Sequence, residues 1–442
     1  MKLNNILSCL QNTDDRVIFK KNNKEFSIQD LIPYAGSEYL NQIIGKKVAI
    51  DSLDFDKAIM IVLLDGIVDE LFILPKGFLE KNKNFLKINK IDEVIDLKKF
   101  KKTKSVSSSL KQILPKYKYT TKWILLTSGT SGTPKQVQHS FLSISSSVKK
   151  SKKNFNPLTW GSAYSLDRFA GTQVFLQAIL GGGTIIFPKS NNIKEMIDEF
   201  ISNDVNSISA TPTLWRKILM QKNCKNMNLK NITLGGEIAD QNILNSLLKF
   251  FPSSSIRHIY ASTEAGASIT VEDNLEGFPE SLMEDKNNKF SIKISDKGTL
   301  LIKASGMSQG YKNSNEELAS KDEYYDTGDL VELRENRYYF LGRESGIINI
   351  GGSKIIPEEV ENNIMKFPGV LDAVVYGRKN SIIGNMLVCE LIIDKFTITE
   401  TKTFIDSLKK FYKKKYSDVS CPRMFKIIEE VKTSEAGKVI RR

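Results

Sequence analysis

Residues 126–135 read Leu126-Thr127-Ser128-Gly129-Thr130-Ser131-Gly132-Thr133-Pro134-Lys135, a run of glycines and hydroxyl side chains that closes with a lysine. The four residues before it, 122–125, read as a buried strand, so the run begins where a strand gives way to a loop. Backbone N–H groups in such a loop can converge on one point, and serine and threonine hydroxyls add donors. The run therefore predicts a nest for phosphate groups.

The spacing of this run differs from that of the commonest phosphate loop. Walker A sequences place lysine directly after glycine, whereas Thr133 and Pro134 separate Gly132 from Lys135. Taken alone, the run also fits an exposed polar loop. The whole string, however, resembles the phosphate-binding signature of the adenylate-forming superfamily of acyl- and aryl-CoA synthetases, luciferase-like enzymes and peptide-synthetase adenylation domains. The resemblance implies a set of residues that contact ATP, with Thr127 also near Mg²⁺: Thr127, Ser128, Gly129, Thr130, Ser131, Gly132, Thr133 and Lys135.

Two later segments resemble the parts of this family that hold adenosine and Mg²⁺. Gly235-Gly236-Glu237 ends an apolar strand, and the resemblance makes it one wall of the adenine site. Residues 259–264, Ile-Tyr-Ala-Ser-Thr-Glu, resemble the family motif Tyr-Gly-x-Thr-Glu. In that motif Tyr260 would flank the adenine, Thr263 would donate to the α-phosphate, and Glu264 would hold Mg²⁺. A capping threonine and glutamate are the purely structural alternative.

Three further segments continue the resemblance toward the C-terminus. Asp329 would accept hydrogen bonds from both ribose hydroxyls, and Arg343 would assist there. Gly351 and Gly352 correspond to glycines that line the channel for the pantetheine arm in members of the family that use CoA. Lys438 would reach the α-phosphate and the acyl carboxylate, where its ammonium and Mg²⁺ would neutralise the growing negative charge.

The segment that faces the substrate in the family departs from the usual pattern. Relatives often carry an aromatic residue or histidine there, but this chain has Asp167 beside Arg168. We favour an ion pair between the two, and contact of one of them with a charged group of the substrate is the alternative. Phe169 stands where amino-acid-adenylating relatives hold the substrate ammonium with an aspartate. This difference weakens the hypothesis of an amino-acid substrate.

Composition limits the classes of function. The 442 residues are 40% hydrophobic and 26% charged, with a net charge of +13. Because the lysines are spread along the chain, an anionic nucleotide substrate accounts for this charge better than a nucleic acid partner. Four cysteines without a paired spacing indicate neither disulfides nor zinc, and no segment suggests a signal peptide or membrane span, so we expect a cytoplasmic protein. Two histidines leave little material for a Ser-His-Asp hydrolase.

Apolar segments alternate between helix and strand patterns in the first 120 residues. Strands are expected at 47–50 and 70–75, and a buried helix is expected at 58–64. This alternation predicts an α/β fold with sheets covered by helices. We expect a large N-terminal domain, residues 1–343, and a small mobile α+β domain, residues 344–442. We also expect a helix at 136–150, whose N-terminus would face the phosphate nest.

These features together predict an acid–thiol ligase. A small carboxylic acid would attack ATP·Mg²⁺ to give an acyl-adenylate and pyrophosphate, and the thiol of CoA would then take the acyl group. The alternative is a stand-alone adenylation enzyme that loads an acyl, hydroxy or amino acid onto the phosphopantetheine of a carrier protein. A non-catalytic nucleotide-binding protein is a third hypothesis, and the intact set of motif residues argues against it.

Overall fold

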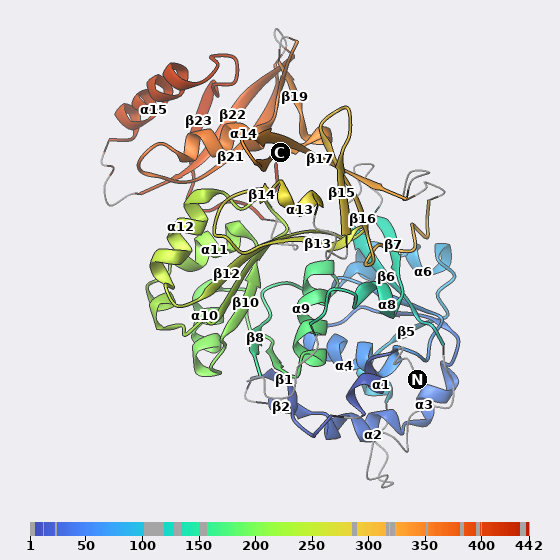
Figure 1. Cartoon of the computed structure of the whole chain (residues 1–442). Coiled ribbons are helices and arrows are strands. Elements are labelled where there is room, and N and C mark those ends of the chain that lie inside the picture. Colours follow the sequence, from blue (N-terminus) through green and yellow to red (C-terminus); the bar gives the residue numbers. More distant parts are fainter. Residues whose placement is uncertain are drawn as a thin grey trace.

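The computed structural model describes residues 5–11, 13–22, 24–100, 119–127, 134–149, 157–284, 290–314, 318, 323–350, 352–380, 384–394, 398, 400–433 and 439–441. Within these ranges the N-terminal part contains two mostly parallel sheets with helices packed on them, followed by an antiparallel sheet (Figure 1). The C-terminal elements form a smaller α+β unit with its own core. None of the helices in the described ranges is long and apolar enough to cross a membrane.

The first sheet has the strand order β5-β3-β4-β6-β7. Its strands are β3 (Lys47–Ile50), β4 (Glu70–Ile73), β5 (Glu93–Ile95), β6 (Lys122–Thr127) and β7 (Lys135–His139). All neighbours are parallel except β7, which runs antiparallel to β6. The short helical elements around it are α1 (Ile6–Leu10), η1 (Gln29–Leu31), α2 (Ile32–Ala35), α3 (Glu38–Gln42), α5 (Phe78–Lys81), α6 (Phe85–Ile88), η2 (Leu97–Lys99) and α8 (Phe141–Ile144).

The second sheet has the order β13-β12-β11-β10-β8-β9-β1-β2, with parallel pairing between β12 and β1 and antiparallel edges. Its strands are β1 (Val17–Lys21), β2 (Lys24–Ser27), β8 (Thr159–Gly161), β9 (Thr184–Ile186), β10 (Ser207–Ala210), β11 (Asn231–Gly235), β12 (Ser255–Ser262) and β13 (Gly266–Val271). The helices that follow its strands are α10 (Ile193–Ser202), α11 (Pro212–Leu219), η3 (Lys222–Asn226) and α12 (Gln241–Phe250).

Two helices, α4 (Asp54–Leu64) and α9 (Phe169–Leu180), contribute to one apolar core that is shared by the two sheets. In α4 every residue from 57 to 64 is buried, which is typical of a helix that is covered on all sides. Both helices contact α1. Leu125 of the first sheet belongs to the same core as Ile185 of the second. The carboxyl ends of β6, β11 and β12 carry the predicted nucleotide motifs.

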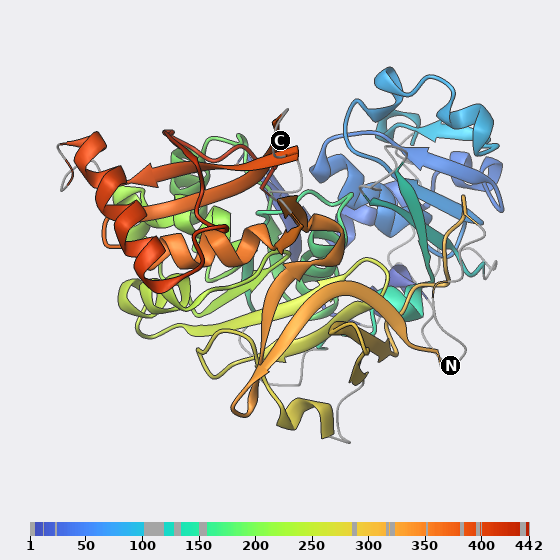
Figure 2. The same cartoon turned by 90° about the horizontal axis from the view of Figure 1, so that it is seen from above.

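The remaining elements form the antiparallel sheet and the C-terminal unit. The sheet has the order β14-β18-β17-β16-β15, made of β14 (Phe278–Pro279), β15 (Phe290–Ile294), β16 (Thr299–Ala304), β17 (Tyr325–Arg334) and β18 (Arg337–Arg343), with helix α13 (Ser281–Glu284) beside it. The C-terminal elements are η4 (Glu344–Gly346), β19 (Ile348–Ile350), β20 (Ser353–Ile355), α14 (Pro357–Met365), β21 (Val370–Asn380), β22 (Gly384–Ile393), α15 (Thr401–Lys415) and β23 (Met424–Ile427). Figure 2 shows these orange and red elements over the half of the molecule that contains β10 to β12.

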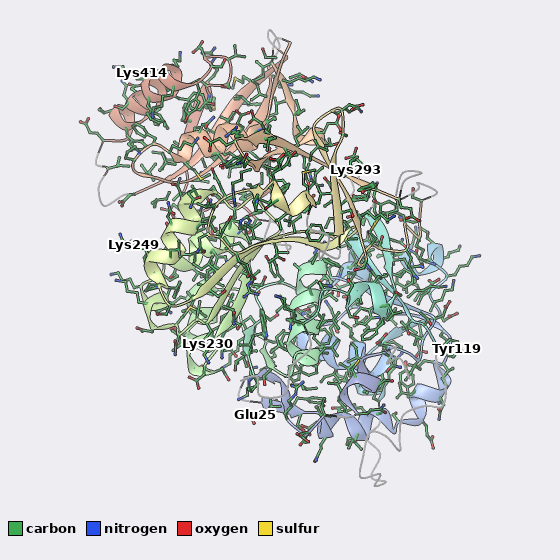
Figure 3. The ribbon with its side chains drawn as sticks, in the orientation of Figure 1. Glu25, Tyr119, Lys230, Lys249, Lys293 and Lys414 are labelled. Carbon is green, nitrogen blue, oxygen red and sulfur yellow. The ribbon has the colours of Figure 1, made fainter. Side chains whose placement is uncertain are left out.

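Helix α15 has one buried face and one basic, solvent-exposed face. Lys413, Lys414 and Lys415 in its last turn are exposed, while Leu408 and Tyr412 are buried against the C-terminal core. Figure 3 shows Lys414 at the outer edge of the molecule. This helix therefore covers the C-terminal core with one face and presents its lysines to solvent with the other.

Several sequence predictions are confirmed and one is wrong. The strand at 47–50 and the buried helix at 58–64 are present, and the strand expected at 70–75 is present as β4, which ends at Ile73. The helix expected at 136–150 is wrong at its start, because residues 135–139 form β7, whose partners run from Thr127 opposite Lys135 to Trp123 opposite His139. In the described part of that range only α8 is helical. The predicted phosphate loop thus joins two antiparallel strands, and no helix begins directly behind it. The pairing with β6 is a tertiary constraint that local propensity does not contain.

A close backbone approach at Gly171 fixes the turn before α9. A Cβ at this position would lie 2.0 Å from the carbonyl oxygen of Ser165. We therefore expect Gly171→Ala to displace that turn and to lower the free energy of unfolding by roughly 1–3 kcal/mol through overpacking. Chemical denaturation would measure the loss. Gly346→Ala is the matched control, because the nearest atom to its Cβ would be 3.9 Å away; equal stability of both variants would contradict the close approach.

Candidate active site

His139 at the end of β7 joins the predicted phosphate loop to the Thr-Glu motif. Its Nε2 lies 2.7 Å from the backbone carbonyl oxygen of Thr263, and its Nδ1 lies 3.1 Å from the hydroxyl of Ser143. Because a carbonyl can only accept, Nε2 carries the proton and Nδ1 is the acceptor. The ring also packs against Phe169 of α9, with centroids 5.6 Å apart. Burial lowers the pKa of His139 to about 4, so the ring stays neutral at physiological pH.

Tyr311 brings Lys135 and Glu264 to one place. The Tyr311 hydroxyl donates to Oε1 of Glu264 at 3.3 Å, and Nζ of Lys135 lies 4.7 Å from the centre of the Tyr311 ring. The backbone of Tyr311 pairs with Val137 of β7, and Ser308 donates its backbone N–H to the carbonyl of Glu264 at 2.8 Å. The two charged residues predicted to serve the phosphates and Mg²⁺ therefore share a neighbour that the sequence did not single out.

A second cluster gathers at Asp329. Its Oδ1 accepts a hydrogen bond from Nε of Arg343 at 2.8 Å, and its Oδ2 accepts one from the hydroxyl of Tyr260. The Tyr260 ring stacks on Phe340, with centroids 4.9 Å apart and planes 11° from parallel. Burial raises the pKa of Tyr260 well above its usual range, and the charge of Asp329 adds to this effect, so the hydroxyl remains a donor. Tyr260 of β12, Asp329 of β17 and Arg343 of β18, all predicted site residues, thus form one hydrogen-bonded cluster.

The Gly235-Gly236-Glu237 segment follows β11 directly. Gly236 has a φ of +83°, a conformation that favours glycine, and the carbonyl of Gly235 accepts a hydrogen bond from the Tyr164 hydroxyl at 2.9 Å. The two oxygens of Glu237 have different partners. One accepts the backbone N–H of Thr213 in the first turn of α11 at 3.0 Å, and the other accepts that of Val439 at 3.0 Å. Glu237 therefore links β11 to the C-terminal tail.

The acid beside Arg168 has a second cation as its partner. Nε of Arg168 lies 3.2 Å from Oδ2 of Asp167, which confirms the predicted pair. Oδ1 of Asp167 lies 3.2 Å from Nζ of Lys57 on α4, whose side chain is only 1% exposed and also pairs with Asp54 at 3.2 Å. Lys57 was missed because a lysine inside an apolar helix pattern gives no local sign of a partner 110 residues away.

Some predicted residues lie outside the described ranges: Ser128, Gly129, Thr130, Ser131, Gly132, Thr133, Gly351 and Lys438. Thr127 and Lys135 are described and stand at the facing ends of β6 and β7. Gly352 has a φ of +88° and no atom within 4 Å of a Cβ built on it. Among the described residues no group of three or more His, Cys, Asp or Glu side chains is suited to a metal. The single carboxylate of Glu264 fits a Mg²⁺ ion that shares its ligands with nucleotide phosphates.

Two family models match the sequence. The one described as AMP-binding enzyme covers residues 73–312, which is more than half of the 442 residues. The chain belongs to the AMP-binding enzyme family. The model described as AMP-binding enzyme C-terminal domain covers residues 359–438. The predicted superfamily and the predicted α/β class, with a large N-terminal part and a small C-terminal domain, are confirmed.

Curated relatives of this AMP-binding enzyme are distant. The 2-succinylbenzoate–CoA ligase of Staphylococcus aureus strain JH9 is 23% identical over 329 residues, which are 72% of this chain and 65% of the ligase. The match thus spans just under two thirds of that relative. Tyrocidine synthase 3 of Brevibacillus parabrevis is 24% identical over 349 residues, which are 72% of this chain and 5% of the synthase.

Solved structures share the fold over nearly the whole chain. The ATP-bound MatB from Rhodopseudomonas palustris has a TM-score of 0.76 at 16% identity, covering 99% of this chain and 97% of MatB. The o-succinylbenzoate CoA synthetase from Bacillus subtilis, in complex with the acyl-adenylate intermediate OSB-AMP, has a TM-score of 0.74 at 18% identity, covering 99% of this chain and 97% of the synthetase. At these identities the likeness shows the fold.

The buried, neutral state of His139 has a measurable consequence for acid stability. Its folded pKa of about 4 lies below the unfolded value of about 6.5, so the unfolded chain binds more protons between them. The contribution of the neutral ring to the free energy of unfolding should be fully present above pH ~6.5. The free energy of unfolding should then fall by roughly 3 kcal/mol as the pH drops toward 4. Urea titrations across this range should show a smaller fall for His139→Gln. An identical fall in wild type and His139→Gln would contradict the assignment.

Proposed function

We propose that this AMP-binding enzyme activates a small carboxylic acid with ATP. A carboxylate oxygen of the acid bonds to the α-phosphorus, the bond from that phosphorus to the bridging oxygen breaks, and pyrophosphate leaves. The product is an acyl-adenylate, from which a thiolate takes the acyl group as AMP departs. The contact between Tyr260, Asp329 and Arg343 carries the proposal, because it offers an aromatic face and a carboxylate to a nucleoside.

Each residue has a proposed role in this reaction. Tyr260 would stack on the adenine that Gly235, Gly236 and Glu237 flank on the other side, and Asp329 and Arg343 would hold the ribose. Thr263 would donate to the α-phosphate, and Lys135 would bind phosphate oxygens together with the N–H groups and hydroxyls of the loop that begins at Thr127. Glu264 and Thr127 would hold Mg²⁺, which neutralises phosphate charge. Lys438 would approach the α-phosphate in the transition state.

We propose the domain division 1–343 and 344–442, with the second domain moving between the two half-reactions. Contacts across this boundary support an adenylating arrangement. The backbone N–H of Val439 donates to Glu237, so the residue after Lys438 lies beside the proposed adenine wall. Nη2 of Arg441 lies 2.6 Å from Glu361 on α14, and Nη1 lies 3.2 Å from Glu358 on the same helix. The tail is therefore held both by Glu237 of the proposed adenine wall and by α14.

The thiol of CoA is the favoured acceptor. The first relative is named as a CoA ligase, and Gly352 leaves open space where a side chain would stand in the proposed pantetheine channel. A carrier protein presents the same pantetheine arm, and the net charge of +13 would suit an acidic carrier. The match to a peptide synthase keeps this second candidate in view.

Pyrophosphate release tests the proposal directly. Purified protein with ATP·Mg²⁺ would be given short, long, aromatic, dicarboxylic, hydroxy and amino acids, each with and without CoA. We expect release that depends on one class of acid and rises when CoA is added. Release that depends on an acid but ignores CoA would favour the carrier-protein acceptor, and silence across every class would count against carboxylate activation.

Replacing Lys438 by alanine should separate catalysis from folding. Loss of the ammonium removes charge neutralisation from the transition state, so adenylate formation should fall by about 100-fold or more while thermal stability is unchanged. Stopped-flow pyrophosphate release would measure the loss. Lys432→Ala is the matched control, because Lys432 is an exposed lysine of the same tail. Undiminished release by Lys438→Ala would refute the role proposed for this residue.

A further inference from the structure

Arg168 lies beside β6, the strand that leads into the predicted phosphate loop. It is the N-cap residue of α9, and Nη1 of its guanidinium lies 3.4 Å from the backbone carbonyl oxygen of Leu126, the penultimate residue of β6. The loop predicted to bind phosphate follows β6 directly. The side chain of Arg168 is 24% exposed, so solvent or a ligand can reach the guanidinium.

Arg168 shares its acidic neighbour with a second, buried cation. Asp167 is 3% exposed and has Lys57 as a buried partner on its other oxygen, at the same 3.2 Å distance as Nε of Arg168. Lys57 also pairs with Asp54, whose pKa is raised by burial, an effect that the charge of Lys57 opposes.

The hydrogen-bond donors of Arg168 are also largely available. A guanidinium has five N–H donors in a planar fork. Among the described residues only the long contact with Leu126 uses one of them, and the buried Nε makes no hydrogen bond despite its approach to Asp167. Asp167 therefore orients the guanidinium by charge, while most of the fork remains able to bind an anion in a bidentate manner.

We propose that Arg168 binds the β- and γ-phosphates of ATP, and so the pyrophosphate formed from them. The inference rests on the proposed function and adds to Lys135 a second cation near the end of β6. Phosphate is favoured over a second carboxylate of the acid because the guanidinium lies against the strand that leads into the phosphate loop. When the bond to the α-phosphorus breaks, negative charge grows on the leaving pyrophosphate, and a fixed guanidinium there lowers the barrier.

A comparison of ATP with AMP isolates these two phosphates without any knowledge of the acid. Calorimetric titrations without acid would be made on wild type, Arg168→Gln and Arg168→Lys. We expect Arg168→Gln to bind ATP about tenfold or more weakly, the loss typical of a charge-assisted contact, and to bind AMP within about twofold of wild type. Arg168→Lys, which keeps the charge but not the fork, should fall between them.

Arg257→Gln is the matched control. Its side chain is also 24% exposed and lies beside an acid, Glu272, at 3.6 Å, and it belongs to the start of β12, away from Tyr260 at the other end. This variant should bind both nucleotides as wild type does. Thermal melting would confirm that each variant is folded, and the lysine variant serves if the glutamine variant is not.

The outcomes separate this inference from the function beneath it. If wild type binds neither nucleotide, the proposed function fails. If wild type binds ATP and folded Arg168→Gln binds it equally well, or loses ATP and AMP affinity by the same factor, Arg168 has only a structural role and the inference is overturned. If ATP binding is unchanged but the KM for the acid rises, Arg168 recognises the acid, and the phosphate assignment is likewise overturned.

Discussion

The hydrogen bond from His139 to the carbonyl of Thr263 is the contact on which the site depends. It joins β7 of the first sheet to the residue after β12 of the second, 124 residues apart in sequence. The imidazole is fully buried and held neutral, so it can donate from Nε2 without placing a charge in the core. Through this bond the strand that leaves the phosphate loop and the Thr-Glu motif keep a fixed distance, and Tyr311 then brings Lys135 and Glu264 together.

Around this hydrogen bond, buried carboxylates connect the cations and backbone groups of neighbouring elements. Lys57, buried on α4, holds Asp167, and Asp167 in turn holds Arg168 at the end of β6. Glu237 uses one oxygen to cap the start of α11 and the other to receive the C-terminal tail. The proposed nucleotide site is thus built from carboxylates that each serve a neighbouring element, so substitutions there are expected to affect stability and binding together.

The sequence was most informative where a short local pattern determines the structure. Alternating apolar runs predicted the parallel strands β3, β4 and β6, and the motif residues Tyr260, Asp329 and Arg343 meet as the resemblance implied. The sequence failed where distant segments decide the structure. The prediction of a helix over β7 is wrong because the pairing of β7 with β6 cannot be read from residues 136–150. Lys57, His139 and Glu264 each have a partner distant in sequence, which are Asp167, Thr263 and Tyr311. The domain boundary and the catalytic roles remain predictions.

An isotope experiment tests the central claim, that the acid attacks the α-phosphorus of ATP. The acid that supports turnover would be supplied with ¹⁸O in its carboxylate, and the nucleotide and phosphate products would be analysed by mass spectrometry. Attack at the α-phosphorus leaves one carboxylate oxygen on that phosphorus after transfer to the thiol, so the account predicts ¹⁸O in AMP and none in pyrophosphate. Formation of ADP, or of AMP without the label, would contradict it.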